Sequence, residues 1–232
     1  MAAGVLGGGV SVLRAANAIA MGSRSREGTS PIMLAEVRRP EVDVALWRRE
    51  VPASLSTLRA WAASTNAPSF DRVVTIDAEA IAAAVSRAPS SLRGALAADV
   101  AMLLGYFVAV AGTARCRLFF GTVRDDNCRK FHVDAVAVRM VTTYVGPGTE
   151  WLSEQAVNRA ALARLIECPS DANAAIVCDP GGVRRAREGD VLMLKGSRDP
   201  NVGGEGAVHR SPPLREPEVR LVLNATAGGP PP

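Results

Sequence analysis

Apolar residues in the first half of the chain recur at the spacing of an α-helix. Four of them repeat at intervals of three and four residues and would share one helical face: Leu55, Leu58, Trp61 and Ala62. A second helix is expected from Asp77, which would cap it, through Val85, and a longer one over about 91–111. The chain up to about residue 114 is therefore predicted to be mainly helical.

Beyond residue 114, short runs rich in Val, Leu and Phe alternate with Gly, Pro and Asp. These runs predict strands at 117–123, 135–144, 190–194 and 219–223. One helix, at about 154–167, is expected to interrupt them. The pattern predicts an α+β fold in which an N-terminal helical layer precedes a cupin-like β-sandwich or jelly roll.

Both ends of the chain lack the signals of regular structure. Residues 1–34 begin with a stretch rich in Ala, Gly and Ser and are expected to be disordered or to precede the true start. The leading apolar stretch has no positive charge before it and contains three successive glycines, which argues against a targeting peptide. A single domain is therefore expected over 35–226, followed by a disordered Gly-Pro tail at 227–232.

Composition restricts the class of partner. The formal net charge is +4, and the basic residues are spread along the chain, so no nucleic-acid surface is indicated. The most apolar stretch, 100–111, is too short to cross a bilayer and predicts a buried helix, with no membrane span. The four cysteines form no paired motif, which fits a reducing bacterial cytoplasm: Cys116, Cys128, Cys168 and Cys178.

The two histidines of the chain suggest a metal site. His132 precedes Asp134 by two positions, and residues two apart on an extended strand point to the same face. A return strand could bring His209 to this pair. Two imidazoles and one carboxylate occupy one face of Fe(II) and leave other positions open, as in non-haem iron oxygenases. Arg220, one short strand later, could hold a carboxylate of a co-substrate in a two-pronged grip.

Other interpretations of these residues remain open. Cys128 as a fourth ligand would favour zinc, in a cupin-like protein that handles metal without redox chemistry. Asp134 could simply orient His132 through a surface hydrogen bond, in a scaffold that binds no metal, and His132 and His209 would then lie far apart. Arg220 could lie along the surface with its charged group in water.

The motif layout resembles the Fe(II) and 2-oxoglutarate dependent dioxygenases, which have a double-stranded β-helix core. Four segments also resemble a bacterial family known as domain of unknown function eighteen-twenty-six: Cys128 to Asp134, Thr143 to Leu152, Leu194 to Gly196 and His209 to Pro212. The chain departs from that family after Leu223, where Asn224 stands in place of an aspartate.

The dioxygenase resemblance implies a set of roles. His132, Asp134 and His209 would bind Fe(II), and Arg220 would hold the distal carboxylate of 2-oxoglutarate. Arg139 and Tyr144, on the strand that follows the first motif, would face the same cavity and contact the substrate or the co-substrate. The substrate, a small molecule or a protein side chain, and the oligomeric state are not indicated by the sequence.

Overall fold

The computed structural model describes residues 24–64, 67, 69–124, 128–200 and 205–228. Within these residues the strands form a seven-stranded sheet and a three-stranded sheet. The larger sheet has the order β1 (Ser25–Gly28), β2 (Val44–Trp47), β8 (Val191–Lys195), β5 (Val138–Val145), β10 (Arg220–Ala227), β4 (Arg115–Val123) and β3 (Ser69–Thr75). The smaller sheet has the order β7 (Val183–Arg185), β6 (Glu150–Leu152) and β9 (His209–Arg210).

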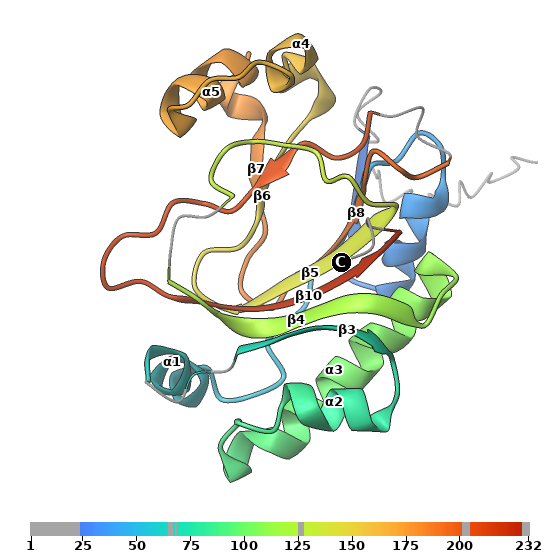
Figure 1. The fold of residues 1–232 in the computed structure, drawn as a ribbon, viewed down its shortest axis with the longest axis vertical. Coiled ribbons are helices and arrows are strands. Elements are labelled where there is room, and N and C mark those ends of the chain that lie inside the picture. Colours follow the sequence, from blue (N-terminus) through green and yellow to red (C-terminus); the bar gives the residue numbers. More distant parts are fainter. Residues whose placement is uncertain (1–23, 65–66, 68, 125–127, 201–204, 229–232) are drawn as a thin grey trace, which may run out of the picture.

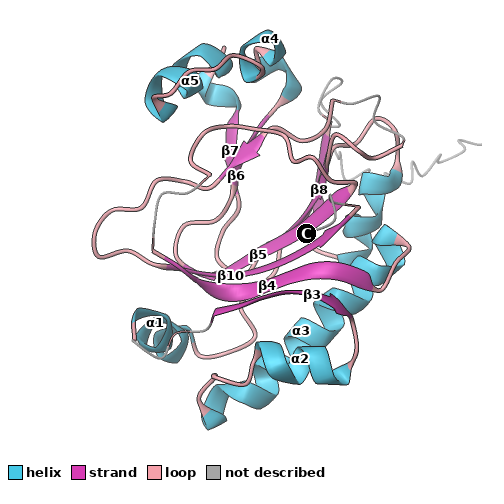
Figure 2. Ribbon diagram, viewed as in Figure 1, coloured by secondary structure: helices cyan, strands magenta, loops and turns pink. Residues whose placement is uncertain are grey.

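Helices and the smaller sheet lie on opposite sides of the larger sheet. α1 (Leu55–Ala63), α2 (Ala78–Ala84) and α3 (Ser90–Ala111) lie below it in Figure 1. The smaller sheet lies above it, with α4 (Arg159–Leu162) and α5 (Pro169–Ile176) beyond (Figure 2). Three 3-10 helices complete the described elements: η1 (Pro31–Arg38), η2 (Glu154–Ala156) and η3 (Pro180–Gly182).

Alternating side chains of the larger sheet build two cores. On β5, Met140 and Tyr144 join the cluster that packs against the helices, whereas Val141 joins the cluster between the two sheets. This division follows from the two-residue period of a strand, which sends successive side chains to opposite faces. The metal ligands predicted above fall on the side of the smaller sheet.

Three predicted helices and the main strands are confirmed with small shifts of their ends. The helix at 55–62 is α1, and the helix at 91–111 is α3. Asp77 caps α2 because its carboxylate accepts a hydrogen bond from the backbone N–H of Ala80 at 2.8 Å. The predicted strand at 135–144 begins only at Val138, in β5, and the predicted strand at 219–223 extends to Ala227 in β10.

The N-terminal part is not a layer of helices alone, since it also supplies β1, β2 and β3 to the larger sheet. β1 pairs in parallel with β2, so the described fold begins at Arg24, ahead of the expected boundary at residue 34. Residues 1–23 and 229–232 lie outside the described residues. Ala227, which the sequence predicts to lie in the tail, is the last residue of β10, and its carbonyl accepts a hydrogen bond from the Ala137 N–H.

The predicted helix at 154–167 is wrong as a single element. The chain forms η2 and α4 there, and α5 follows at Pro169. Between η2 and α4 the backbone is extended, because Val157 forms a β-bridge with Val177 and Asn158 donates its N–H to Ile176. Tertiary pairing thus overrides the local preference for a continuous helix.

By length and apolar character alone, α3 could cross a membrane, although the stretch 100–111 is shorter. Core helices of soluble proteins meet the same criterion. One side of α3 packs into the cluster between the helices and the larger sheet, through residues that include Leu96, Leu103 and Phe107.

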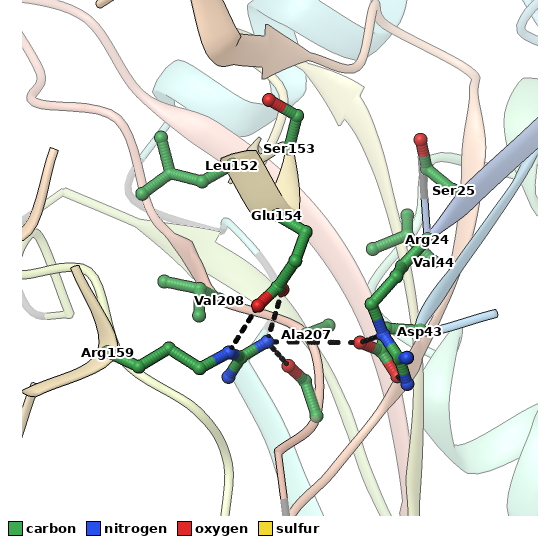
Figure 3. Close-up of a pocket in the computed structure, with 11 residues that line it drawn as sticks. Arg24, Ser25, Asp43, Val44, Leu152, Ser153, Glu154, Arg159, Ala207 and Val208 are labelled. Atoms are coloured by element: carbon green, nitrogen blue, oxygen red, sulfur yellow. Dashed lines mark hydrogen bonds and ion pairs between the residues drawn. The ribbon is translucent and has the colours of Figure 1, made fainter. Parts of the chain in front are cut away.

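Charged residues join the segment after β6 to the edge of the larger sheet (Figure 3). Arg159 binds Glu154 with two hydrogen bonds, at 2.8 and 2.7 Å, and lies 3.9 Å from Asp43. Asp43 also pairs with Arg24, whose Nε lies 2.5 Å from the carboxylate. The pocket among these side chains has a volume of about 10 Å³, no more than one water molecule needs. We interpret it as a packing seam between the two sheets.

Candidate metal centre

The backbone brings the two histidines together. The His132 N–H donates to the His209 carbonyl at 3.0 Å, and the His209 N–H donates to the His132 carbonyl at 2.9 Å. This pair extends the edge of the smaller sheet, because His209 lies on β9. The two imidazole centroids are 4.7 Å apart. The interpretation in which the histidines lie far apart is therefore wrong.

Asp134 completes a cluster of three potential ligands. Its carboxylate lies 3.6 Å from Nε2 of His132 and 3.2 Å from Nε2 of His209. Each of the three residues offers one ligand atom, and these atoms all lie within 4.8 Å of one another. Metal bonds of about 2.0–2.2 Å require ligand atoms no more than about 4 Å apart, and the distances from Asp134 to both imidazoles meet this requirement.

The other nitrogen of each imidazole is bound to the backbone. Nδ1 of His132 lies 2.8 Å from the Lys130 carbonyl, and Nδ1 of His209 lies 3.0 Å from the Ala207 carbonyl. A carbonyl oxygen only accepts, so each Nδ1 donates its N–H, and each Nε2 is turned toward Asp134. Burial lowers the pKa of His209 and outweighs the opposing effect of Asp134. The lowered pKa favours the neutral ring, which is the form that binds metals.

One oxygen of the Asp134 carboxylate, Oδ2, has no aligned hydrogen-bond donor among the described residues. Burial alone would raise its pKa, but the close contacts with His132 and His209 and the charge of Arg139 hold the pKa well below its usual range. Oδ2 is nonetheless buried with no well-aligned hydrogen bond from any residue that the structure describes. A cation at the cluster would satisfy this oxygen, so the residues present fit a metal ion.

Arg220 lies nearby in a buried environment without a carboxylate. Its side chain donates to three hydroxyl groups: Ser211 at 2.8 Å, Thr143 at 3.2 Å and Thr149 at 3.4 Å. Among the described residues no carboxylate forms an ion pair with Arg220, and its Nε has no hydrogen-bond partner. Burial lowers the pKa of Arg220 to about 10, so the guanidinium stays charged at neutral pH.

The histidines and Arg220 open into one cavity of about 710 Å³. This volume is within the range of small-molecule sites. The floor of the cavity is the face of the larger sheet that is turned toward the smaller sheet. Its lining includes residues from β4, β5, β8 and β10, among them Phe119, Arg139, Leu194 and Asn224.

Residues 28–225 match the model of a family described as a protein of unknown function, DUF1826. The chain belongs to the DUF1826 family. This confirms the resemblance noted from the sequence blocks. No protein of curated function matches this DUF1826 chain.

Solved structures show which fold the DUF1826 chain shares. The dioxygenase for auxin oxidation from rice is 12% identical, with a TM-score of 0.51, over 89% of this chain and 83% of that one. The corresponding Arabidopsis thaliana protein, solved with 2-oxoglutarate, is 9% identical over 89% and 92% of the chains, with a TM-score of 0.48. An Fe(II)/α-ketoglutarate-dependent dioxygenase, TqaL, is 17% identical over 60% and 56%, with a TM-score of 0.36. The likeness to the rice enzyme shows that this chain has a dioxygenase-like fold.

Tyr144 does not face the cavity, contrary to the sequence-based expectation. Its side chain is fully buried on the helix side of the sheet, where its hydroxyl donates to Asp99 at 2.6 Å. The preceding residue, Thr143, faces the opposite way and reaches Arg220. Arg139 does line the cavity, and its Nε lies 3.0 Å from Asp134.

Cys128 lines the same cavity but is not a member of the ligand cluster, which among the described residues contains His132, Asp134 and His209. Its backbone has a φ of 64°, and its carbonyl accepts a hydrogen bond from Ser211. The geometry therefore presents three ligands of an open site rather than the four of a closed zinc site.

The hydroxyl residues around Arg220 were missed by the sequence analysis. Thr143 and Thr149 come from β5 and the turn after it, and Ser211 follows β9. Two features of the sequence could have drawn attention to these residues. Ser211 comes two residues after His209, and Thr143 precedes Tyr144 in a predicted strand. Neither signal indicates contact with Arg220 before the strands are paired.

Proposed function

We propose that this DUF1826 protein is an Fe(II) and 2-oxoglutarate dependent oxygenase that acts on a small molecule. One observation carries the proposal: an open cluster of two histidines and one aspartate shares a cavity with a buried arginine that has no carboxylate partner among the described residues. A metal needs the first feature, and a carboxylate co-substrate needs the second.

The protein would hold the metal through His132, Asp134 and His209. Hydrogen bonds from each Nδ1 to a backbone carbonyl fix the rings with Nε2 toward the cluster. Bound Fe(II) would supply the dioxygen chemistry in which 2-oxoglutarate loses CO₂ to give succinate and one oxygen atom enters a C–H bond of the substrate.

Arg220 would hold the distal carboxylate of 2-oxoglutarate. Three hydroxyl groups orient the guanidinium without neutralising it, since none of them carries a negative charge. A carboxylate would supply the missing charge and accept two parallel hydrogen bonds in a site shielded from water. The hydroxyls of Ser211 and the two threonines can also donate to the same carboxylate.

A titration of anaerobically purified protein tests the proposal. Fe(II) is added first, then 2-oxoglutarate, while the weak visible charge-transfer band of the chelate is recorded. We expect the band in the wild type, its loss in His132→Ala, and a much higher 2-oxoglutarate requirement in Arg220→Gln. Succinate formed after admission of air provides a second measurement.

One control variant and one contrary outcome complete the test. Asp71→Asn removes a carboxylate from the cavity rim, away from the ligand cluster, and is expected to keep the band. Tight zinc binding that depends on Cys128, with no band in the wild type, would replace the oxygenase proposal with the metal-handling alternative.

A further inference from the structure

The cavity extends along the larger sheet well beyond Arg220. Residues at every second position of β10 share the cavity face, and Thr226 lies six positions after Arg220. At about 3.4 Å per residue this is roughly 20 Å of strand. The register places Asn224 between Phe119 of β4 and Val141 of β5, and it places Thr226 next to Arg139 of β5. This far part of the floor has no role in holding 2-oxoglutarate at Arg220.

Positive charge dominates the described lining of the cavity. Five arginines line it, against one lining carboxylate, Asp71: Arg117, Arg124, Arg139, Arg210 and Arg220. Asp71 is already paired with Arg117, through hydrogen bonds of 2.8 and 2.6 Å. Arg210 is paired with Glu150 at 2.7 Å. A cavity with this balance concentrates anions.

Arg139 is the arginine of the far floor with unused hydrogen-bonding capacity. Its Nε is buried and forms an ion pair with Asp134 at 3.0 Å, although the two groups are not aligned as a hydrogen bond. No residue that the structure describes accepts a hydrogen bond from it. A guanidinium offers five donors, and a buried donor without an acceptor is costly. The N–H groups of Arg139 that do not face Asp134 are available to an anion bound in the cavity.

Apolar side chains lie beside Arg139. Leu194 is its neighbour on β8, and Val141 follows it on the same face of β5. Phe119 adds an aromatic ring across Asn224. The Oδ1 of Asn224 is buried with no hydrogen-bond partner in the described chain, so it offers an acceptor for an N–H or O–H group.

We propose that the substrate is a small molecule with an anionic group, a carboxylate or a phosphate monoester, on an apolar body. Arg139 binds the anionic group, and Phe119, Val141 and Leu194 contact the body. Asn224 accepts a hydrogen bond from a polar group of the substrate. This inference rests on the proposed oxygenase function, because it assigns the part of the cavity that 2-oxoglutarate does not fill.

Binding of four linear probes with six carbon atoms each tests the inference: hexanoate, hexyl phosphate, hexanamide and hexylamine. Each is titrated by calorimetry into anaerobic protein that is loaded with Fe(II) and saturated with 2-oxoglutarate, so that Arg220 is occupied. The charge-transfer band is recorded in parallel. We expect hexanoate or hexyl phosphate to bind at least about tenfold more tightly than hexanamide, as a charge-assisted hydrogen bond predicts. The tighter of the two identifies the anionic group.

Variants assign the preference to Arg139. Arg139→Gln is expected to remove it, and Arg139→Lys, which keeps the charge but not the two-pronged geometry, is expected to retain part of it. Arg115→Gln removes an exposed guanidinium of β4 that does not line the cavity, and it should leave the preference unchanged. The iron content of each variant is measured, since Arg139 also contacts Asp134. If Arg139→Gln loses iron, the preference of Arg139→Lys for the anionic probe over hexanamide decides whether Arg139 binds the anionic group.

The outcomes separate this inference from the proposed function. Equal binding of hexanamide and hexanoate, or a preference that survives in Arg139→Gln, would overturn the substrate class while the oxygenase proposal stands on its band. A wild-type protein that binds Fe(II) and 2-oxoglutarate without forming the band would overturn both.

Discussion

His132 and His209 each donate a backbone hydrogen bond to the other, at 3.0 and 2.9 Å. The two residues are distant in sequence. Both hydrogen bonds join backbone atoms, so neither of them involves an imidazole. The proximity of the rings therefore follows from the β-pairing, which makes no use of either Nε2 atom. Removal of a ring should consequently affect metal binding far more than folding.

We expect His209→Ala and Asp134→Ala to lose iron and keep their fold. Loss of an outer partner of a metal ligand typically costs 10–100-fold in affinity, and loss of a ligand should cost at least about that much. Iron content after anaerobic reconstitution measures the effect, with circular dichroism as the check on folding. A variant that retains stoichiometric iron at wild-type affinity would exclude that residue from the ligand set.

Arg220→Gln should weaken 2-oxoglutarate binding without a loss of iron. A hydrogen bond to a charged group contributes about 1.5–3 kcal/mol, which corresponds to roughly 10–150-fold in the dissociation constant. Arg220→Lys should give an intermediate affinity, because an ammonium group keeps the charge but cannot make the two-pronged contact. Titration of the chelate band measures both. Unchanged affinity in the glutamine variant contradicts the assigned role.

Bound metal should stabilise the folded protein. The ligands converge only in the folded chain, so an ion present at 100 times its dissociation constant would add about 2.7 kcal/mol to the free energy of unfolding. Addition of a chelator should lower the melting temperature of the wild type and leave that of Asp134→Ala unchanged. An equal effect of the chelator on both proteins would show that the stabilising ion binds elsewhere.

The proximity of His132, Asp134 and His209, with Arg220 in the same cavity, could be predicted from the sequence because its signal lies in short motifs. Two residues in an H-x-D pattern and a lone distant histidine need no knowledge of the fold. The hydroxyl groups around Arg220 could not be predicted, since Thr143 and Ser211 meet it only after β5 and β10 pair. The prediction that Tyr144 faces the cavity is wrong for a related reason: a shift of one residue in a strand reverses the direction of every side chain.

The main strands and three helices carried clear periodicity, whereas three N-terminal strands did not. All four residues of β2 are buried, so the segment shows no alternation of apolar and polar positions. β3 lies at the edge of the larger sheet and is largely exposed, so it lacks an apolar face. Such strands are defined by their neighbours rather than by their own sequence.

Tyr144→Phe should lower stability and leave 2-oxoglutarate binding unchanged. The hydroxyl of Tyr144 donates to buried Asp99, which also forms an ion pair with Arg49. Loss of this hydrogen bond to a charged group should cost about 1.5–3 kcal/mol in the free energy of unfolding. Tyr106→Phe is the matched control, since Tyr106 packs edge-on against Trp47 through its ring. Chemical denaturation measures the stability. A change in 2-oxoglutarate affinity in Tyr144→Phe would contradict the conclusion that Tyr144 lies outside the cavity.

The same residue predicts a dependence of stability on alkaline pH. Burial and the charge of Asp99 raise the pKa of Tyr144 well above its usual value near 10. The unfolded chain then releases this proton at lower pH than the folded chain does. The contribution of the Tyr144 hydroxyl to the free energy of unfolding is therefore complete below about pH 10 and declines as the pH rises beyond it. The difference in unfolding free energy between wild type and Tyr144→Phe should shrink over that range. A difference that stays constant would contradict the raised pKa.

Gly146→Ala should damage both stability and the Arg220 site. Gly146 has a φ of +87°, and a Cβ atom there would lie 2.3 Å from the carbonyl oxygen of Val219 and 3.3 Å from the Cα of Arg220. The backbone must move at Arg220, the residue proposed to hold the co-substrate, so we expect a loss of more than about 1 kcal/mol in stability together with weaker 2-oxoglutarate binding. Gly105→Ala is the matched control: nothing lies within 4 Å of its Cβ position, and α3 should gain about 0.5–1 kcal/mol. If both substitutions had the same effect, the close packing of Gly146 on β10 would not position Arg220.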